Sequence, residues 1–313
     1  IFNKGNDLIR YKEAKSIVNS HLFRLGAETV NLNKSSDRTL AQDVVASFSS
    51  PMFDNSAMDG FAVRSRDTVG ARNEKPVTLK MVSISAAGSP SDLEIGSGEC
   101  AQCMTGAEIP KGADAVVMVE DTSGFSDSDT VQIFLETLPG KHIRKKGEEI
   151  KEQELLIPKG TPITSSELGT CATFGYSKLS VSKQPEITLF GTGNELVEPG
   201  LPLEAGQIYN SNLYMLSDLV EKAGGKVRKK EIIKDNKKSL RSFLSQTLQT
   251  SDVVITSGGI SMGRYDYVRE VFTELGVREH FWKVEQKPGK PLFFGTRNST
   301  LIFGLPGNPI SSY

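Results

Sequence analysis

The chain has 313 residues, long enough for two or three domains that each bury a core of their own. Its 37 basic and 38 acidic residues give a net charge of −1, so the composition argues against broad nucleic-acid binding and against adsorption to an anionic membrane. No run approaches the roughly 18 apolar residues of a membrane span, and residues 1–15 lack the apolar core of a signal peptide. The sequence therefore predicts a cytoplasmic globular protein.

The first elements in the chain are predicted to form a mixed α+β layer. Apolar positions at helical spacing predict a helix over residues 11–25, with Gly26 as its C-terminal cap. A basic stretch, residues 141–150, is predicted to be a solvated loop that leads back to this layer through proline and glycine turns. We therefore expect residues 1–46 and 141–183 to form one discontinuous N-terminal subdomain.

Residues 47–140 have a different pattern, with short β-rich runs separated by Gly, Pro, Ser and Asp clusters. This pattern predicts a separate, small β-rich domain. Cys100 and Cys103 form a C-x-x-C within it, but no second pair and no neighbouring histidine completes a zinc site. We interpret the spacing as chance within a strand, and the three cysteines of the chain predict no disulfide framework.

From residue 184 onward, predicted strands and helices alternate. In chain order they are strand 186–191, helix 210–225, strand 226–233, helix 237–248, strand 252–258 and helix 265–276. The alternation predicts a mainly parallel, doubly wound α/β domain over residues 184–313. Ser211 is a predicted N-cap, and the paired Gly224 and Gly225 are predicted to end the same helix.

Three strand-then-loop units near the end of this domain suit an anion site: DVVITSGGISMGRYDY, QKPGKPLFFG and TLIFGLPGNPIS. Glycines allow close backbone approach or positive φ, helix starts would present free N–H groups, and lysines supply charge. The residues concerned are Gly258, Gly259, Gly289, Gly307, Ser261, Ile310, Lys287 and Lys290. Any one such loop could simply turn the chain. Together, at the carboxyl edge of one sheet, they predict a binding site for an oxyanion.

The sequence lacks the motifs that are typical of other common enzyme chemistries. The domain contains neither G-x-x-x-x-G-K-[ST] nor a complete G-x-G-x-x-G, so ordinary NTP hydrolysis and dinucleotide redox chemistry are disfavoured. His21, His142 and His280 fit no metal-ligand or Ser-His-Asp pattern, and we interpret each as a structural or surface histidine.

Six segments resemble a known family: PMFDNSAMDGFAVR, CMTGAEIPKGADAVVMVED, GTGNELVEPG, TSGGISMGRYDYV, KPGKPLFFG and GLPGNP, in that order. They are similar to the MoeA family of molybdopterin molybdenumtransferases, whose animal relative is the E domain of gephyrin. The resemblance runs from about Leu22 to Tyr313. It implies a MoaB/Mog-like doubly wound α/β domain, a small β-rich domain and the mixed N-terminal layer.

The activity that the resemblance implies is insertion of molybdate into the dithiolene of adenylylated molybdopterin, with release of AMP and assistance from Mg²⁺. Molybdate is a tetrahedral dianion, which suits fixed ammonium groups and backbone donors. The residues expected to bind molybdate or the pterin substrate are Lys287, Lys290, Ser311, Gly258, Gly259, Ser261 and, as a weaker match, Asp235.

The resemblance also implies a set of catalytic residues. Asp59, Thr105, Glu195 and Asp266 match functional positions of the family motifs. Asp266 and Asp59 are the expected Mg²⁺ ligands, because Mg²⁺ is held by one or two carboxylates together with phosphate oxygens and waters. Thr105 would hydrogen-bond the substrate, although a turn-stabilising hydroxyl is an alternative.

Because Asp59 and Thr105 belong to the β-rich domain and the lysines to the α/β domain, one chain alone need not bring them together. The resemblance implies an elongated homodimer in which the β-rich domain of one subunit faces the α/β domain of the other. Contact with the upstream adenylyltransferase is a further expected interaction, and no nucleic-acid or membrane partner is expected.

Family members continue into a further small β-barrel, a fourth subdomain, whereas this sequence stops at Tyr313, so reduced turnover is expected. Two other functions stay open. Mog-type adenylyl transfer to molybdopterin uses the same α/β fold, but the loop reads T-S-G-G-I-S-M-G rather than T-T-G-G-T-G, and the N-terminal half would be unexplained. A gephyrin-like scaffold is the other alternative.

Overall fold

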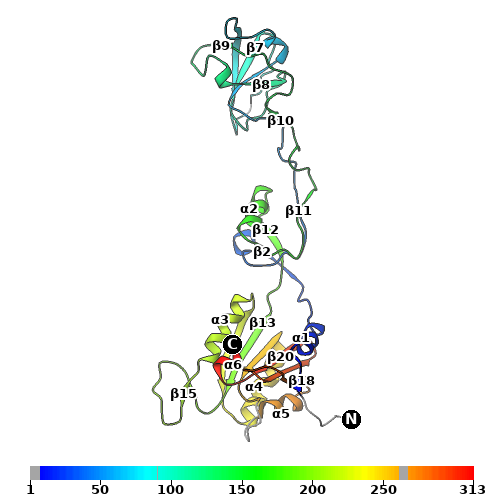
Figure 1. Cartoon of the computed structure of the whole chain (residues 1–313), viewed down its shortest axis with the longest axis vertical. Helices are drawn as coiled ribbons and strands as arrows, with labels where there is room; N and C mark the ends of the chain where they lie inside the picture. The colour runs from blue at the N-terminus through cyan, green and yellow to red at the C-terminus, as the bar shows by residue number, and fades with distance from the viewer. Residues whose placement is uncertain (1–7, 90, 261–266) are drawn as a thin grey trace. The chain divides into compact units, whose positions relative to one another are not determined.

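The computed structural model describes residues 8–89, 91–260 and 267–313. By its internal contacts the chain divides into two compact units. The described residues of 1–30, 37–41 and 180–313 make up the first unit, and those of 31–36 and 42–179 make up the second. Figure 1 labels several elements of each unit.

The first unit is built on a seven-stranded sheet. Its strands, in spatial order, are β1 (Leu8–Ile9), β18 (Arg278–Val284), β19 (Pro291–Arg297), β20 (Thr300–Leu305), β17 (Val253–Ser257), β13 (Glu186–Thr192) and β16 (Lys226–Ile233). The four strands β20, β17, β13 and β16 are parallel to one another, and β19 is antiparallel to both of its neighbours. The prediction of a mainly parallel sheet is therefore confirmed.

Helices cover both faces of this sheet: α1 (Tyr11–Ser20), α3 (Asn212–Lys222), α4 (Lys237–Thr250) and α5 (Tyr267–Glu274), with the short α6 (Pro309–Ser312) after β20. Successive side chains along a strand point to opposite faces. Phe190 and Ile302 pack with α4 and α5 on one face, whereas Leu189 packs with α3 and Leu301 with α1 on the other. The doubly wound α/β class predicted from the alternating elements is confirmed (Figure 1).

The first helix is shorter than the expected 11–25. The hydroxyl of Ser20 donates to the carbonyl of Ile17 at 2.7 Å, and Nδ1 of His21 lies 2.8 Å from the same oxygen. Side chains thus occupy the end of the helix. Leu22 beyond it is 59 % exposed, so no apolar burial extends the helix further.

The start of α3 also differs in detail from the expectation. Ser211 occupies the N-cap position but makes no side-chain cap bond. The carboxamide oxygen of Asn210 instead accepts the backbone N–H of Leu213 at 3.3 Å. Gly224, with φ of +85°, follows the helix as predicted.

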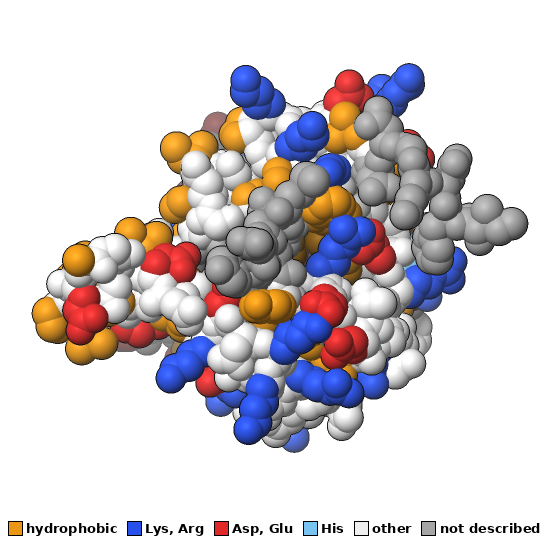
Figure 2. Space-filling view, turned by 90° about the horizontal axis from the view of Figure 1, so that it is seen from below, with side chains coloured by type: hydrophobic (Ala, Val, Ile, Leu, Met, Phe, Trp, Pro, Cys, Tyr) orange, Lys and Arg blue, Asp and Glu red, His pale blue; other side chains and the backbone are white. Residues whose placement is uncertain are grey.

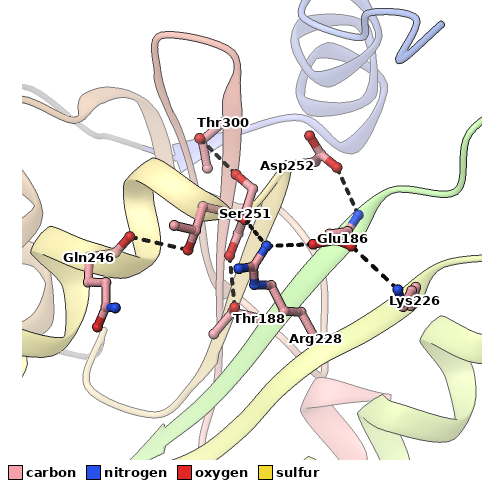
Figure 3. A network of polar contacts seen from close by, with 9 residues as sticks. Glu186, Thr188, Lys226, Arg228, Gln246, Ser251, Asp252 and Thr300 are labelled. Carbon is pink, nitrogen blue, oxygen red and sulfur yellow. Dashed lines mark hydrogen bonds and ion pairs between the residues drawn. The ribbon is translucent and has the colours of Figure 1, made fainter.

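A polar network lies at the amino-terminal edge of the sheet (Figure 3). Asp252 accepts the backbone N–H of Glu186 at 2.8 Å, and the carboxylate of Glu186 pairs with Arg228 at 2.6 Å. The hydroxyls of Thr188 and Ser251, both buried, are 2.8 Å apart. These contacts hold together the starts of β13, β16 and β17.

The second unit contains a five-stranded sheet with the order β8 (Ala115–Met118), β5 (Gly60–Val63), β7 (Glu99–Cys103), β6 (Val77–Ser85) and β9 (Thr130–Ile133). One face buries Phe61 and Leu79, and the other buries Ala62 and Ile95. The β-rich character predicted for this part of the chain is confirmed.

Shorter elements complete the chain. They are β2 (Ala27–Asn31), β3 (Val44–Val45), β4 (Asn55–Ser56), β10 (Ile143–Arg144), β11 (Leu155–Ile157), α2 (Ser165–Thr173), β12 (Lys178–Ser182), β14 (Leu196–Val197), β15 (Ile208–Tyr209) and the 3₁₀ turns Leu32–Lys34, Ser65–Thr68 and Val119–Asp121. The finer division into 1–46 with 141–183, 47–140 and 184–313 stays a prediction.

Cys100 and Cys103 both lie in β7 and, like Cys171, are buried free thiols. The interpretation of the C-x-x-C as a spacing within a strand agrees with this placement. In the part of the chain that the structure describes, no helix has the length and apolarity needed to cross a bilayer.

Candidate functional site

A pocket of about 360 Å³ lies at the carboxyl ends of β13, β17 and β20 in the first unit. Ligands of open α/β sheets bind at this edge. The pocket is lined by Gly191, Thr192, Gly193, Glu195, Leu196, Ile208, Tyr209, Asn210, Ser211, Asn212, Asp235, Ser257, Gly258, Gly259, Ile260, Pro291, Pro306, Gly307 and Pro309. The structure thus brings together two of the three predicted glycine loops, those around Gly258 and Gly307.

The turn after β17 requires its two glycines. Gly258 and Gly259 have φ of +89° and +71°, a region that side chains disfavour. A Cβ on Gly259 would also lie 2.4 Å from Val268 and 2.5 Å from Thr192. The backbone N–H of Gly258 donates to Leu305 at 3.0 Å, so this donor is engaged within the protein rather than free for an anion.

Asn212, at the start of α3, connects the loops of the pocket. Its Nδ2 donates to the hydroxyl of Ser257 at 2.6 Å and to the carbonyl of Gly307 at 2.8 Å. The residue is 9 % exposed, and its Oδ1 has no hydrogen-bond partner among the described residues. Two bonds from one amide therefore fix the ends of β17 and β20 relative to α3.

Both charged residues that line the pocket in the described part of the chain are acidic. They are Glu195, in the loop after β13, and Asp235, after β16. Asp235 accepts a hydrogen bond from the hydroxyl of Thr192 at 3.2 Å. The carboxylate of Glu195 lies so close to Gly193 that a Cβ there would be 2.6 Å from it. An anionic ligand in this pocket would need a compensating cation.

The two lysines predicted to bind an oxyanion lie beside the pocket rather than among its lining residues. Lys287 and Lys290 are exposed, while Pro291, directly after them, lines the pocket. Gly289, with φ of +89°, lies between them, and a Cβ on it would be 3.2 Å from the carbonyl of Ser311. The Lys-Pro-Gly-Lys turn and the Ser311 segment are therefore neighbours, and the binding of molybdate there stays a prediction.

Asp59 and Thr105 meet in the second unit. Oδ1 of Asp59 accepts the backbone N–H of Thr105 at 2.6 Å and its hydroxyl at 2.7 Å. These two donors, the backbone N–H first, lower the pKa of the Asp59 carboxyl below its ordinary value. Asp59 is thus held as an exposed carboxylate at neutral pH.

Ser261 and Asp266, two further residues expected at the site, lie outside the described residues. Among the described residues, no group of three or more His, Cys, Asp or Glu side chains is placed to hold a metal ion. A magnesium ion, in contrast, needs only one or two carboxylates together with ligand phosphates and waters. Glu195 and Asp235 fit that requirement.

A second hollow, of about 410 Å³, lies at the amino-terminal edge of the sheet between residues 248–252 and 297–300. Its polar groups bind one another: the hydroxyl of Thr300 donates to Ser251 at 3.0 Å, and Arg297 donates to Leu248 at 3.5 Å. It contains no glycine turn with positive φ. We therefore assign the candidate site to the carboxyl edge.

The face drawn in Figure 2 carries basic and acidic side chains interspersed, with no large patch of one sign. Ion pairs join α4 to α5, since Lys237 of α4 pairs with Glu270 of α5 and Arg241 pairs with Glu274. This face offers no basic track for a phosphate backbone.

Sequence reasoning missed Asn210 and Asn212. The segment Y-N-S-N precedes an amphipathic helix, which favours a capping interpretation, and only the folded sheet places Asn212 against Ser257 and Gly307. Two polar residues at a helix start facing a predicted sheet edge were the available signal.

Family models match both halves of the chain. The MoeA N-terminal region, domains I and II, matches residues 9–175, and a probable molybdopterin binding domain matches residues 188–313. The pocket lies within the second match.

Individual relatives agree with the family models. The chain is 37 % identical over 305 residues to the molybdopterin molybdenumtransferase of Staphylococcus aureus strain Mu50, which covers 97 % of this chain and 72 % of that protein. It is 36 % identical over 306 residues to the enzyme of the same name from Staphylococcus epidermidis, with the same coverage. The crystal structure of the molybdopterin biosynthesis MoeA protein from Pyrococcus horikosii superposes with a TM-score of 0.84 at 32 % identity, covering 97 % of this chain and 76 % of that one. The chain belongs to the MoeA family.

Proposed function

We propose that the chain acts in molybdenum cofactor biosynthesis as a molybdopterin molybdenumtransferase that inserts molybdate into adenylylated molybdopterin and releases AMP. The pocket carries this proposal. It lies in the part of the chain that matches a molybdopterin binding domain, at the sheet edge where α/β folds bind ligands, between glycine turns that bring backbone close to a ligand.

Within this proposal, Lys287, Lys290 and Ser311 present molybdate at the rim of the pocket. Their support is the packing of Gly289 against the Ser311 carbonyl, which places the lysine turn beside α6. Two exposed ammonium groups on a short, constrained turn can bind a dianion without the cost of ordering long loops.

Magnesium is proposed to bind at Glu195 and Asp235, with Asp266 as a further candidate that lies outside the described residues. When bound, it would neutralise charge on the phosphoanhydride that is cleaved as AMP leaves. Asp235 lines the pocket, and Thr192 restrains its carboxylate by a hydrogen bond of 3.2 Å. Gly258 and Gly259 keep the wall of the pocket free of side chains.

Asp59 and Thr105 are proposed to act on the same substrate from a second copy of the chain in a homodimer. Their support is the exposed position of Asp59 and its lowered pKa, which give an accessible carboxylate that pairs with no basic side chain in the part of the chain that the structure describes. In the dimer, Asp59 would contribute to the Mg²⁺ site together with the carboxylates of the pocket.

The deciding experiment measures AMP release from adenylylated molybdopterin after addition of molybdate and Mg²⁺. Release that depends on both additions and needs no ATP is the expected result. Consumption of ATP with molybdopterin as acceptor would favour the adenylyltransferase alternative, and neither reaction would favour a scaffold.

The dimer has its own test. Asp59→Asn and the double variant Lys287→Ala/Lys290→Ala, each assayed at a molybdate concentration at which it alone has little activity, are mixed under conditions that exchange subunits. If each site uses residues from both copies, mixing restores activity to about a quarter of wild type, since half of the dimers are mixed and each has one intact site. No recovery in demonstrated mixed dimers would contradict the shared site.

A cytoplasmic location is part of the proposal, and it is supported by three free thiols, as expected in a reducing compartment. Contact with the upstream adenylyltransferase, which would supply the adenylylated pterin, is also proposed. Co-sedimentation of the two purified proteins in the presence of that intermediate tests it.

A further inference from the structure

Trp282, the only tryptophan of the chain, lies behind the glycine turn of the pocket. Its indole N–H donates to the carbonyl of Ile260 at 2.6 Å. Ile260 lines the pocket, whereas Trp282 is not among the lining residues. The tryptophan thus contacts the wall of the pocket from the protein side.

Two cations hold the indole ring itself in place. The guanidinium of Arg269, from α5, lies 4.1 Å from the ring centroid, and the ammonium of Lys283 lies 4.0 Å from it. Arg269 is fixed in turn by two hydrogen bonds of 2.7 Å to the carboxylate of Glu279 on β18. Trp282 is 8 % exposed and belongs to the core beneath α4 and α5.

The turn that Trp282 contacts is also held at its other end. Gly258 donates to Leu305 at 3.0 Å, and its carbonyl accepts the hydroxyl of Thr256 at 3.2 Å. Gly259 is the one residue between Gly258, which makes these contacts, and Ile260, whose carbonyl accepts the indole N–H. The indole bond therefore fixes the exit of a glycine turn that has few side-chain contacts of its own.

We infer that Trp282 is a positioning residue for the pocket, one that holds the Gly258–Ile260 turn in its ligand-binding shape through the indole N–H. Trp282 acts through Ile260. Its substitution should therefore weaken ligand binding without removing a group that touches the ligand. The inference concerns binding at the pocket and to that extent rests on the proposed function.

The test separates the N–H from the bulk of the ring. Trp282→β-(3-benzothienyl)alanine replaces the N–H by sulfur and keeps the two fused rings, whereas the genetically encoded Trp282→Phe removes the N–H together with part of the ring. We expect each variant to bind AMP, measured by calorimetry, about tenfold more weakly than wild type, as for a buried carbonyl left without its donor. KM for adenylylated molybdopterin should rise more than kcat falls.

A second measurement does not depend on any ligand. Amide hydrogen exchange in the peptide that contains residues 257–260 should be faster in both variants. Phe281→Leu is the matched control, because Phe281 is buried on the opposite face of β18 with Val284 and Phe294. It should lower the melting temperature while AMP affinity and exchange in the turn stay at wild-type values.

Wild-type AMP affinity together with wild-type exchange in the benzothienyl variant would overturn the inference. If wild-type protein does not bind AMP, the proposed use of the pocket fails, and the exchange measurement alone decides whether Trp282 holds the turn. Loss of AMP binding in Phe281→Leu equal to that in the Trp282 variants would also contradict a specific role for the indole N–H.

Discussion

Thr105 supplies two donors to one oxygen of Asp59, its backbone N–H at 2.6 Å and its hydroxyl at 2.7 Å. The two residues come from separate segments, the loop before β5 and the turn after β7. Because both donors favour the charged form, the pKa of Asp59 lies below its ordinary value. A carboxylate that stays ionised and keeps one orientation is suited to bind a cation or to accept a proton from a substrate.

The hydroxyl contribution can be removed by itself. Thr105→Ala should raise the pKa of Asp59 toward its ordinary value of about 3.9 but not fully, since the backbone N–H, the larger cause, remains. Thr105→Ser keeps the hydroxyl and should leave the pKa low. Carbon-13 NMR titration of the Asp59 carboxyl measures both, and an equal pKa in the two variants would contradict the assignment.

Gly259→Ala should damage both the fold and the pocket. The new Cβ would meet Val268 at 2.4 Å and Thr192 at 2.5 Å, at φ of +71°. We expect a loss of about 1–3 kcal/mol in the free energy of unfolding and loss of AMP binding. Gly276→Ala is the control: φ is +79° but nothing lies within 4 Å, so a loss of about 1 kcal/mol with normal binding is expected. Denaturant unfolding measures the first quantity and calorimetry the second.

Lys290→Ala and Lys287→Ala should each raise the molybdate concentration needed for half-maximal AMP release by about tenfold, because a charge-assisted hydrogen bond to the dianion is lost. Binding of AMP should stay within about twofold of wild type. Lys238→Ala, an exposed lysine of α4, controls for loss of general positive charge. A molybdate dependence that none of the three variants changes would remove the lysine turn from the site.

The cysteines should be unreactive in the native protein. Burial raises the pKa of Cys100 to about 12 and that of Cys103 to about 11, and it also raises the pKa of Cys171. At pH 8 the thiolate fraction of the first two is then about one in a thousand or lower. A thiol-reactive dye should label none of the three in buffer and all three in guanidinium. Rapid native labelling of Cys100 or Cys103 would show that β7 opens.

His280 gives a pH dependence of stability. Burial, then the neighbouring His21, whose ring centroid is 4.0 Å away, and Arg278 lower the pKa of His280. Because the pKa of His280 is lower in the folded state, the unfolded state binds the proton more tightly. The fold therefore keeps its full stability above the unfolded pKa of about 6.5, and it loses stability as the pH falls below that value.

The melting temperature of wild-type protein should therefore fall more steeply between pH 7 and pH 5.5 than that of His280→Gln. His142→Gln, in the second unit, serves as a comparison, because burial also lowers the pKa of His142 but no other histidine ring among the described residues contacts it. Parallel curves of melting temperature against pH for wild type and His280→Gln would show that the pKa of His280 is the same in the folded and the unfolded state.

The α/β unit was predictable because its strands and helices alternate in strongly patterned runs, and the carboxyl-edge rule then placed Gly258, Gly259 and Gly307 at one pocket. Details that depend on tertiary contacts were not predictable from the sequence. The backbone N–H of Gly258 donates to the carbonyl of Leu305 on the neighbouring strand. The side chain of Asn212 hydrogen-bonds two loops that are distant from it in sequence. Neither contact has a local sequence pattern.

The end of α1 at Ser20 also depends on tertiary contacts. Helical spacing continues past Ser20, but whether Leu22 is buried depends on the sheet beneath it. Lys287 and Lys290, which the sequence predicts to bind molybdate, lie beside the lining residues of the pocket. Gly289 between them lies against the Ser311 carbonyl, a contact that the K-P-G-K segment alone does not specify.

The position of β20 in the sheet has a consequence for folding kinetics. It is the last strand in the described sequence, yet it lies between β19 and β17 and joins the β16–β13–β17 side of the sheet to the β18–β19 side. The β19–β20 pair is a local hairpin, whereas β20 pairs with β17 across the segment that contains α5, β18 and β19. The loops after β13 and β17 therefore form only part of the pocket, and Pro306 and Gly307 complete it once the β19–β20 hairpin pairs with β17. Partly folded chains would have no complete site, so substrate would be captured only by molecules that have finished folding.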